Sequence, residues 1–278
     1  SGQADRDFAA SEIEGAQLVQ QVTALIGRAQ THRGLTNRAL SGDAAARQAL
    51  DGTRSEFAQA VQAVDAAVAR TSRFEAATLW QPRKAAVEEL AQGRHSTQRT
   101  EAFAQHTVAI EDLRQMLLMV AERSNLLLDP EANTFFLMDI AVERTPPLSE
   151  ALGVTRGQGS AILVRGEASN TERVQILGRM DALVKQLADL RNKVDALQRA
   201  GDTPPASWDM ALSATESFAD EVRKVFGADV IDGDAKAFFD HGSQAMTALS
   251  TFNTDVITAL NQALELRLGR VKLECRHA

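Results

Sequence analysis

In MDALVKQLADLRNKVDAL, residues 180–197, apolar side chains recur in alternating steps of three and four residues. These side chains are Met180, Leu183, Leu187, Leu190, Val194 and Leu197. The spacing places them on one stripe of an α-helix, and it is typical of helices that pack at a shallow angle in a bundle. Residues 57–68 keep the same steps, and so do residues 257–271 apart from Arg267. The sequence therefore predicts an all-α fold.

The composition agrees with this prediction. Of 278 residues, 44% are apolar and 24% charged, and the helix formers Ala, Leu, Gln, Glu and Arg are abundant. A single cysteine excludes an intrachain disulfide and a zinc cluster built from cysteines. The net charge of −7 argues against a large nucleic-acid-binding face, so no nucleic-acid partner is expected.

Helix start and stop signals divide the chain into about eight helices. The first four are expected at residues 4–31, 43–71, 74–92 and 96–128, and a fifth begins at Asp129-Pro130. The last three are expected at residues 170–199, 205–226 and 234–274. Pro146-Pro147 is expected to break the fifth helix, and the glycines between 153 and 166 are expected to keep the next stretch irregular. The first and last helices are expected to be long.

Three features recur in the same order in the two halves of the chain. They are His32-Arg33-Gly34 with Thr155-Arg156-Gly157, Trp80 with Trp208, and residues 102–106 with residues 237–241. This order predicts two stacked four-helix bundles, residues 1–128 and residues 129–278. Chance similarity between Ala-rich helices is the alternative explanation.

Signatures of catalysis are absent from the sequence. It contains no glycine-rich phosphate loop, no nucleophile elbow and no His-Glu-x-x-His motif. The five histidines fall on separate expected elements without ligand spacing, and no two carboxylates form a convincing catalytic pair. We therefore expect no enzyme activity, no metal and no cofactor.

Arg33 and Arg156 are the best candidates for a binding site. Each precedes a glycine at an expected helix end or break, and a guanidinium offers a fixed fork of donors that suits planar anions. His32, Asn37 and Thr155, with Thr36 and Gln158, are candidate accessory contacts. The alternative is that each arginine only interacts with a helix dipole at a glycine-terminated end.

Two segments resemble known sensor proteins. Residues 30–36, QTHRGLT, resemble the Arg-Gly-Leu-Ser/Thr signature of nitrate- and nitrite-sensing (NIT) domains. Residues 124–139, SNLLLDPEANTFFLMD, resemble the extracytoplasmic regions of bacterial chemoreceptors (methyl-accepting chemotaxis proteins), in which Leu-Asp-Pro precedes an aromatic pair and Leu-Met-Asp. Phe135-Phe136 stand where tyrosines are common in that family.

The resemblance implies an extracytoplasmic sensor of a transmembrane receptor, similar to NIT and helical bimodular domains. Such a domain would be periplasmic and homodimeric, with flanking membrane helices outside this sequence. It would bind a small anion, such as nitrate, nitrite or a carboxylate, and signal by helix displacement, most simply for chemotaxis. Carried over by position, Arg33 and Arg156 would hold the anion. A basic end, Arg267 to His277, suits a phospholipid surface.

Two other functions stay open at this stage. A helical scaffold that senses a partner protein and binds no small ligand would use the stripes at 180–197 and 257–271 for helix association. A helical enzyme is the third alternative, although no catalytic constellation supports it.

Overall fold

The computed structural model describes residues 2–126 and 131–277, and within these ranges the protein is all-α, as predicted. The first bundle consists of α1 (Gly2–Leu40), α2 (Ala44–Arg70), α3 (Ala76–Ala91) and α4 (Arg99–Arg123). The second consists of α5 (Ala132–Met138), the π-helical segment η2 (Asp139–Arg144), α6 (Thr145–Arg165), α7 (Asn170–Arg199), α8 (Trp208–Phe226) and α9 (Ala235–His277).

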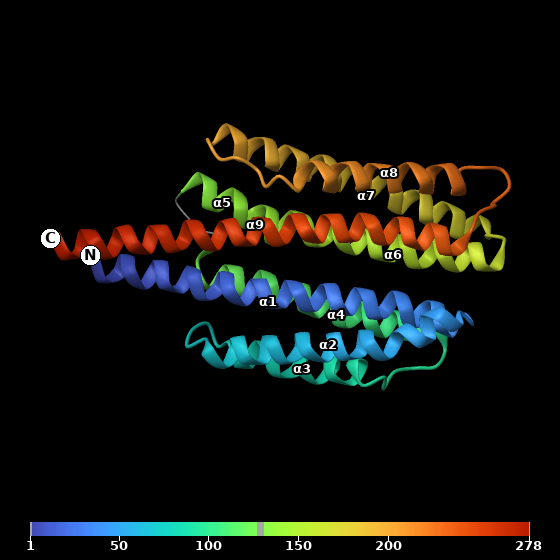
Figure 1. Ribbon diagram of the computed structural model, residues 1–278, viewed down its shortest axis with the longest axis horizontal. Coiled ribbons are helices and arrows are strands. Elements are labelled where there is room, and N and C mark those ends of the chain that lie inside the picture. The colour runs from blue at the N-terminus through green and yellow to red at the C-terminus, as the bar shows by residue number, and fades with distance from the viewer. Residues whose placement is uncertain (1, 127–130, 278) are drawn as a thin grey trace.

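The two bundles lie side by side along their lengths, with α1 and α9 adjacent at the centre of the molecule (Figure 1). Both termini lie at the same end, where α1 begins and α9 finishes (Figure 1). These two helices are long, as expected, with 39 and 43 residues. The segments α5, η2 and α6 follow one another without a break, so this run counts as one helix of the second bundle.

The apolar stripe of α7 explains why this helix packs as it does. All six apolar side chains of the stripe are buried, and the opposite face of the helix carries charges. The helix begins at a capping box, in which Ser169 accepts a hydrogen bond from the Glu172 amide while the Glu172 side chain accepts one from the Ser169 amide. Local capping and periodic burial therefore both define this helix.

Three expectations about helix ends and breaks are wrong. Helix α1 continues through Gly34 to Leu40, and α6 continues through its glycines to Arg165. Pro146 and Pro147 occupy the first positions of α6, directly after η2, and the helical run continues through them, so they do not break it. The expected boundary between residues 128 and 129, and the Asp129-Pro130 cap, lie outside the described residues.

Arg267 joins the two long helices near the chain ends. Its guanidinium donates to Glu12 Oε1 of α1 at 3.0 Å and to Thr134 Oγ1 of α5 at 2.7 Å. Arg267 is 8% exposed and Glu12 is fully buried, so this arginine faces the protein interior and not a lipid surface. Among the helices that the structure describes, none is long and apolar enough to span a bilayer.

Candidate functional site

Arg33 extends from the C-terminal part of α1, seven residues before the helix ends at Leu40, into the interface between the bundles. It is 1% exposed, and its two terminal nitrogens donate to both carboxylate oxygens of Glu150 on α6, at 2.9 and 2.8 Å. It also donates to Thr107 Oγ1 at 3.1 Å, and its guanidinium lies 4.9 Å from the centroid of the Phe103 ring. Arg33 is therefore a buried cation with a buried, bidentate counterion.

Arg156 extends from the middle of α6 into the same interface, and its surroundings resemble those of Arg33 except that, among the described residues, they lack a carboxylate and include a main-chain carbonyl. Its guanidinium lies 4.4 Å from the centroid of the Phe239 ring and donates to Ser243 Oγ at 3.0 Å. Ser243 follows Phe239 by four residues, as Thr107 follows Phe103. Arg156 also donates to the Gln30 carbonyl at 3.3 Å. No carboxylate of the described chain pairs with it.

The charge on Arg156 is consequently the least compensated in the interface. Burial, together with the positive charges of Arg33 and Arg38, lowers the pKa of the Arg156 guanidinium to about 9, against the raising effect of Glu150. The side chain is 5% exposed and still protonated at neutral pH. A buried charge that has hydrogen bonds but no counterion is unfavourable, so a mobile anion would be stabilised here.

Glycines allow the two arginines to cross between α1 and α6. A Cβ atom added to Gly34 would lie 2.7 Å from Arg156 Nη2, and one added to Gly153 would lie 2.7 Å from Arg33 Nη2. Each guanidinium thus lies against a glycine of the opposite helix. These glycines are in continuous helix because they make room for side chains, not because they end a helix.

A pocket of about 500 Å³ lies next to Arg156, between α1, α6 and α9. Its walls include Gly27, Gln30 and Thr31 from α1, and Thr145 and Ser149 from α6. Helix α9 contributes a stripe of four hydroxyl side chains at intervals of three and four residues: Ser243, Thr247, Ser250 and Thr254. A volume in the range of ~300–1,000 Å³ is typical of small-molecule sites.

His32 lies away from this pocket, in the core of the first bundle. His106 Nδ1 donates to the Ala102 carbonyl, which leaves His106 Nε2 to accept from His32 Nδ1 at 2.7 Å. His95 lies nearby with its ring edge-on to His32 and tilted against His106, at centroid distances of 5.9 and 5.4 Å. Burial lowers the pKa of His32 to about 3 and that of His106 to about 4. Among the described residues, no group of His, Cys, Asp and Glu side chains is arranged to hold a metal ion.

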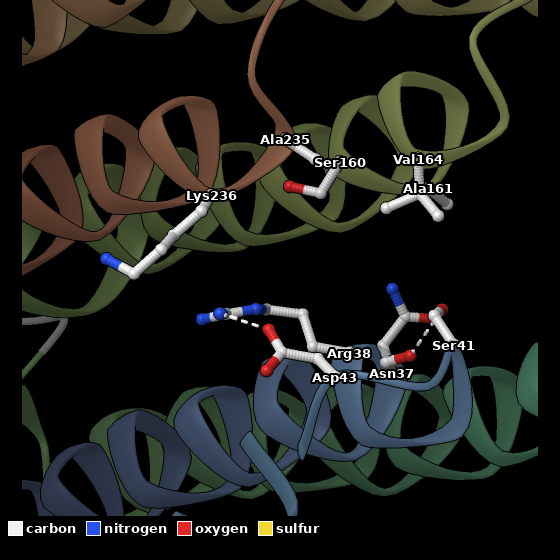
Figure 2. A pocket seen from close by; sticks show the side chains of 9 residues that line it. All are labelled: Asn37, Arg38, Ser41, Asp43, Ser160, Ala161, Val164, Ala235 and Lys236. Atoms are coloured by element: carbon white, nitrogen blue, oxygen red, sulfur yellow. Dashed lines mark hydrogen bonds and ion pairs between the residues drawn. The ribbon is translucent and has the colours of Figure 1, made fainter. Parts of the chain in front are cut away.

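Asn37 and Thr155 also lie outside the large pocket. Asn37 lines a smaller pocket of about 70 Å³ near the ends of α1 and α6, where Arg38 pairs with Asp43 (Figure 2). Because Asp43 neutralises Arg38, this pocket offers less free positive charge than the one beside Arg156. Thr155 is fully buried in α6, and its hydroxyl has no hydrogen-bond partner in the described chain.

Of the candidate residues taken from the sequence, the structure brings Arg33 and Arg156 together at the bundle interface. Reasoning from sequence missed Glu150, Thr107, Phe239 and Ser243, which surround them. The signal that could have found three of these was the Phe-x-x-x-Thr/Ser pattern at Phe103 and Phe239, which also occurs at Phe74 in the first half.

No family model and no curated protein matches this chain. Its fold is similar to a solved structure of the NasR transcription antiterminator, with a TM-score of 0.74 and 19% sequence identity. The match covers 96% of this chain and 73% of the NasR chain.

This similarity corrects several expectations. The structure that the fold matches belongs to a transcription antiterminator, so the identification as an extracytoplasmic chemoreceptor sensor is wrong, and so are the chemotaxis and transmembrane-receptor functions. The exclusion of nucleic acid as a partner is withdrawn, because an antiterminator acts in transcription. The lack of enzyme activity stays a prediction, and neither the structure nor this similarity tests where the protein is located.

Proposed function

We propose that this chain is an anion-binding regulatory domain whose ligand binds Arg156 at the interface of the two bundles. The observation that carries the proposal is a guanidinium that is 5% exposed, has no carboxylate partner in the described chain and borders a pocket of about 500 Å³. Arg33 supports the site from the other side, with its own charge already paired to Glu150.

The position of the site gives the ligand a way to change the molecule. The pocket has walls from α1 of the first bundle and from α6 and α9 of the second. An anion that fits one packing of the bundles better than another shifts the equilibrium between them by its difference in affinity. The same α1 and α9 meet near the chain ends through Arg267 and Glu12, so a shift between them reaches the termini.

We also propose that the regulated process is transcription, since the fold is shared with a transcription antiterminator over 96% of this chain. Retention of a random-sequence RNA pool on a filter, with and without sodium nitrate or sodium acetate, tests whether this chain contacts RNA itself. Retention that changes with the anion supports a direct contact. Equal background retention in both conditions contradicts it.

Thermal unfolding tests the anion site. Sodium nitrate, nitrite, acetate and succinate would each replace an equal ionic strength of sodium chloride. An anion present at 100 times its dissociation constant adds ~2.7 kcal/mol to stability, which raises the midpoint of a domain this size by roughly 5–10 °C. We expect Arg156→Gln to abolish the rise, and Arg179→Gln, at an exposed position of α7, to keep it. No rise with any anion in the wild type contradicts the proposal.

A further inference from the structure

The two arginine sites differ at the residue that lies three positions before the contacted glycine. This difference indicates which charge the ligand carries. Arg33 lies against Gly153, and three residues before that glycine Glu150 supplies the bidentate carboxylate. Arg156 lies against Gly34, and three residues before that glycine is Thr31, an exposed side chain in the wall of the pocket. The second arginine thus lacks the carboxylate that the first one has.

The balance of charges in the interface indicates how many negative charges the ligand carries. Glu150 balances one of the two buried guanidiniums, and Asp43 balances the neighbouring Arg38. One positive charge, on Arg156, stays uncompensated in the interface. A single negative charge neutralises it, whereas a second would be buried next to Glu150 without a partner.

The pocket is much larger than a small inorganic anion. Its volume of about 500 Å³ compares with ~30 Å³ for one water molecule in the liquid. From Arg156 the pocket extends past Ser149 to Thr145, which is ~16 Å along the helix at 1.5 Å per residue. The hydroxyl stripe of α9 follows the same direction, from Ser243 to Thr254. These walls offer hydrogen bonds to a polar ligand that continues beyond its charged end.

We propose that the ligand is a hydroxylated organic monocarboxylate. Its carboxylate pairs with Arg156 as the Glu150 carboxylate pairs with Arg33, and its hydroxyl-bearing carbons lie against Thr247 and Ser250. This inference rests on the proposed function, because it names the class of anion that the Arg156 site binds.

Titration calorimetry of the full chain tests the inference with four sodium salts: nitrate, acetate, gluconate and succinate. Gluconate has the carboxylate of acetate on a chain of hydroxylated carbons, and succinate adds a second charge instead. We expect gluconate to bind at least about tenfold more tightly than acetate, and succinate to bind more weakly than acetate.

Substitutions in the pocket wall test where the hydroxylated part of the ligand binds. Thr247→Val combined with Ser250→Ala should reduce the advantage of gluconate over acetate to within about threefold and leave acetate binding unchanged. Both positions are exposed, so the fold tolerates the changes. Thr258→Val is the matched control, an exposed position of α9 outside the pocket, and it should keep the advantage.

A second pair of variants tests where the carboxylate of the ligand binds. Thr31→Glu supplies a built-in carboxylate three residues before Gly34, so it should raise the midpoint of thermal unfolding and abolish binding of acetate and gluconate. Thr31→Gln has the same shape without the charge and should retain binding.

The outcomes separate the two proposals. If none of the salts binds, the proposed function fails. If nitrate or acetate binds through Arg156 but gluconate binds no more tightly, or succinate binds best, the proposed function stands and the monocarboxylate inference is overturned. An advantage of gluconate that survives the Thr247 and Ser250 changes, or that Thr258→Val removes, also overturns it.

Discussion

At the scale of single residues, Arg33 and Arg156 have the same chemistry and opposite electrostatic situations. One is buried with a counterion and the other without. Removing one partner of a buried ion pair leaves an uncompensated charge and costs about 3–5 kcal/mol, whereas removing an uncompensated buried charge relieves an existing cost. The two sites should therefore respond in opposite directions to the loss of one charge.

We expect Glu150→Gln to lower the free energy of unfolding by about 3 kcal/mol or more, because Arg33 loses its counterion. Arg156→Met should leave the free energy unchanged or raise it in chloride buffer, since a similar side-chain length is kept without the charge. Urea unfolding of both variants measures this. A larger loss for Arg156→Met than for Glu150→Gln would show that the Arg156 charge is already balanced.

The buried histidine pair makes stability depend on pH. Burial lowers the pKa of His32 to about 3 and that of His106 to about 4, while both have their ordinary value of 6.5 in the unfolded chain. Between these values the unfolded state binds more protons than the folded state, so the free energy of unfolding falls as the pH falls from about 6.5 to about 4.

The slope over this window should be about 1.4 kcal/mol per pH unit for each histidine. His106→Asn removes one of the two titrating groups, so we expect it to remove about half of the slope between pH 6.5 and 5, whatever its effect on stability at pH 7. Urea unfolding at a series of pH values measures both slopes. Equal slopes in the variant and the wild type would contradict the assignment.

At the scale of elements, the glycines of α6 and α7 have different roles. A Cβ added to Gly157 would lie 2.6 Å from the Phe103 ring, whereas one added to Gly178 would meet nothing within 4 Å. In an open helical position alanine is more stable than glycine by ~1 kcal/mol, because it loses less conformational entropy.

We therefore expect Gly178→Ala to raise the free energy of unfolding by about 0.5–1 kcal/mol, and Gly157→Ala to lower it because Phe103 must shift. Chemical denaturation of the two single variants provides the comparison. If Gly157→Ala were also stabilising, the close packing between α4 and α6 would be wrong.

The helices themselves could be predicted from the sequence, but the structural role of the glycines within them could not. The stripe of residues 180–197 is periodic, and periodic burial forms a helix wherever a partner covers it. The glycines at 34, 153, 157 and 159 look like breaks because their local preference is all that a sequence displays. Their role comes from Arg156, Arg33, Phe103 and Phe238, which pack against them from other helices.

Some residues of the candidate site could likewise be predicted from the sequence, and others could not. Arg33 and Arg156 could be found because each precedes a glycine in a repeated pattern. Glu150 could not, since only the folded structure shows that α6 places it opposite Arg33. His32 adjoins Arg33 in sequence, but successive side chains of a helix point in different directions, so His32 faces the core of the first bundle. Asn37 lies one turn beyond Arg33 on the same face of α1, where its side chain donates to the Gly157 carbonyl of α6 and lines the smaller pocket.

At the scale of the whole molecule, two similar bundles form one unequal interface. Arg33 and Arg156 occupy equivalent positions in this interface. Within the described chain only Arg33 has a carboxylate partner, Glu150, so the two halves of the interface are not symmetric. Whole-molecule function was the least predictable property from sequence, because one fold serves proteins with different outputs. The similarity to NasR shows the fold and corrects the receptor assignment, but the binding site rests on its own residues.

An anion at Arg156 can be located directly by crystals of the wild-type chain grown in sodium bromide, with anomalous diffraction measured at the bromine edge. We expect an anomalous peak within hydrogen-bond distance of the Arg156 guanidinium, in the pocket between α1, α6 and α9, and no peak there in Thr31→Glu crystals. Peaks only at exposed arginines, with none at Arg156, would contradict an anion site at the bundle interface.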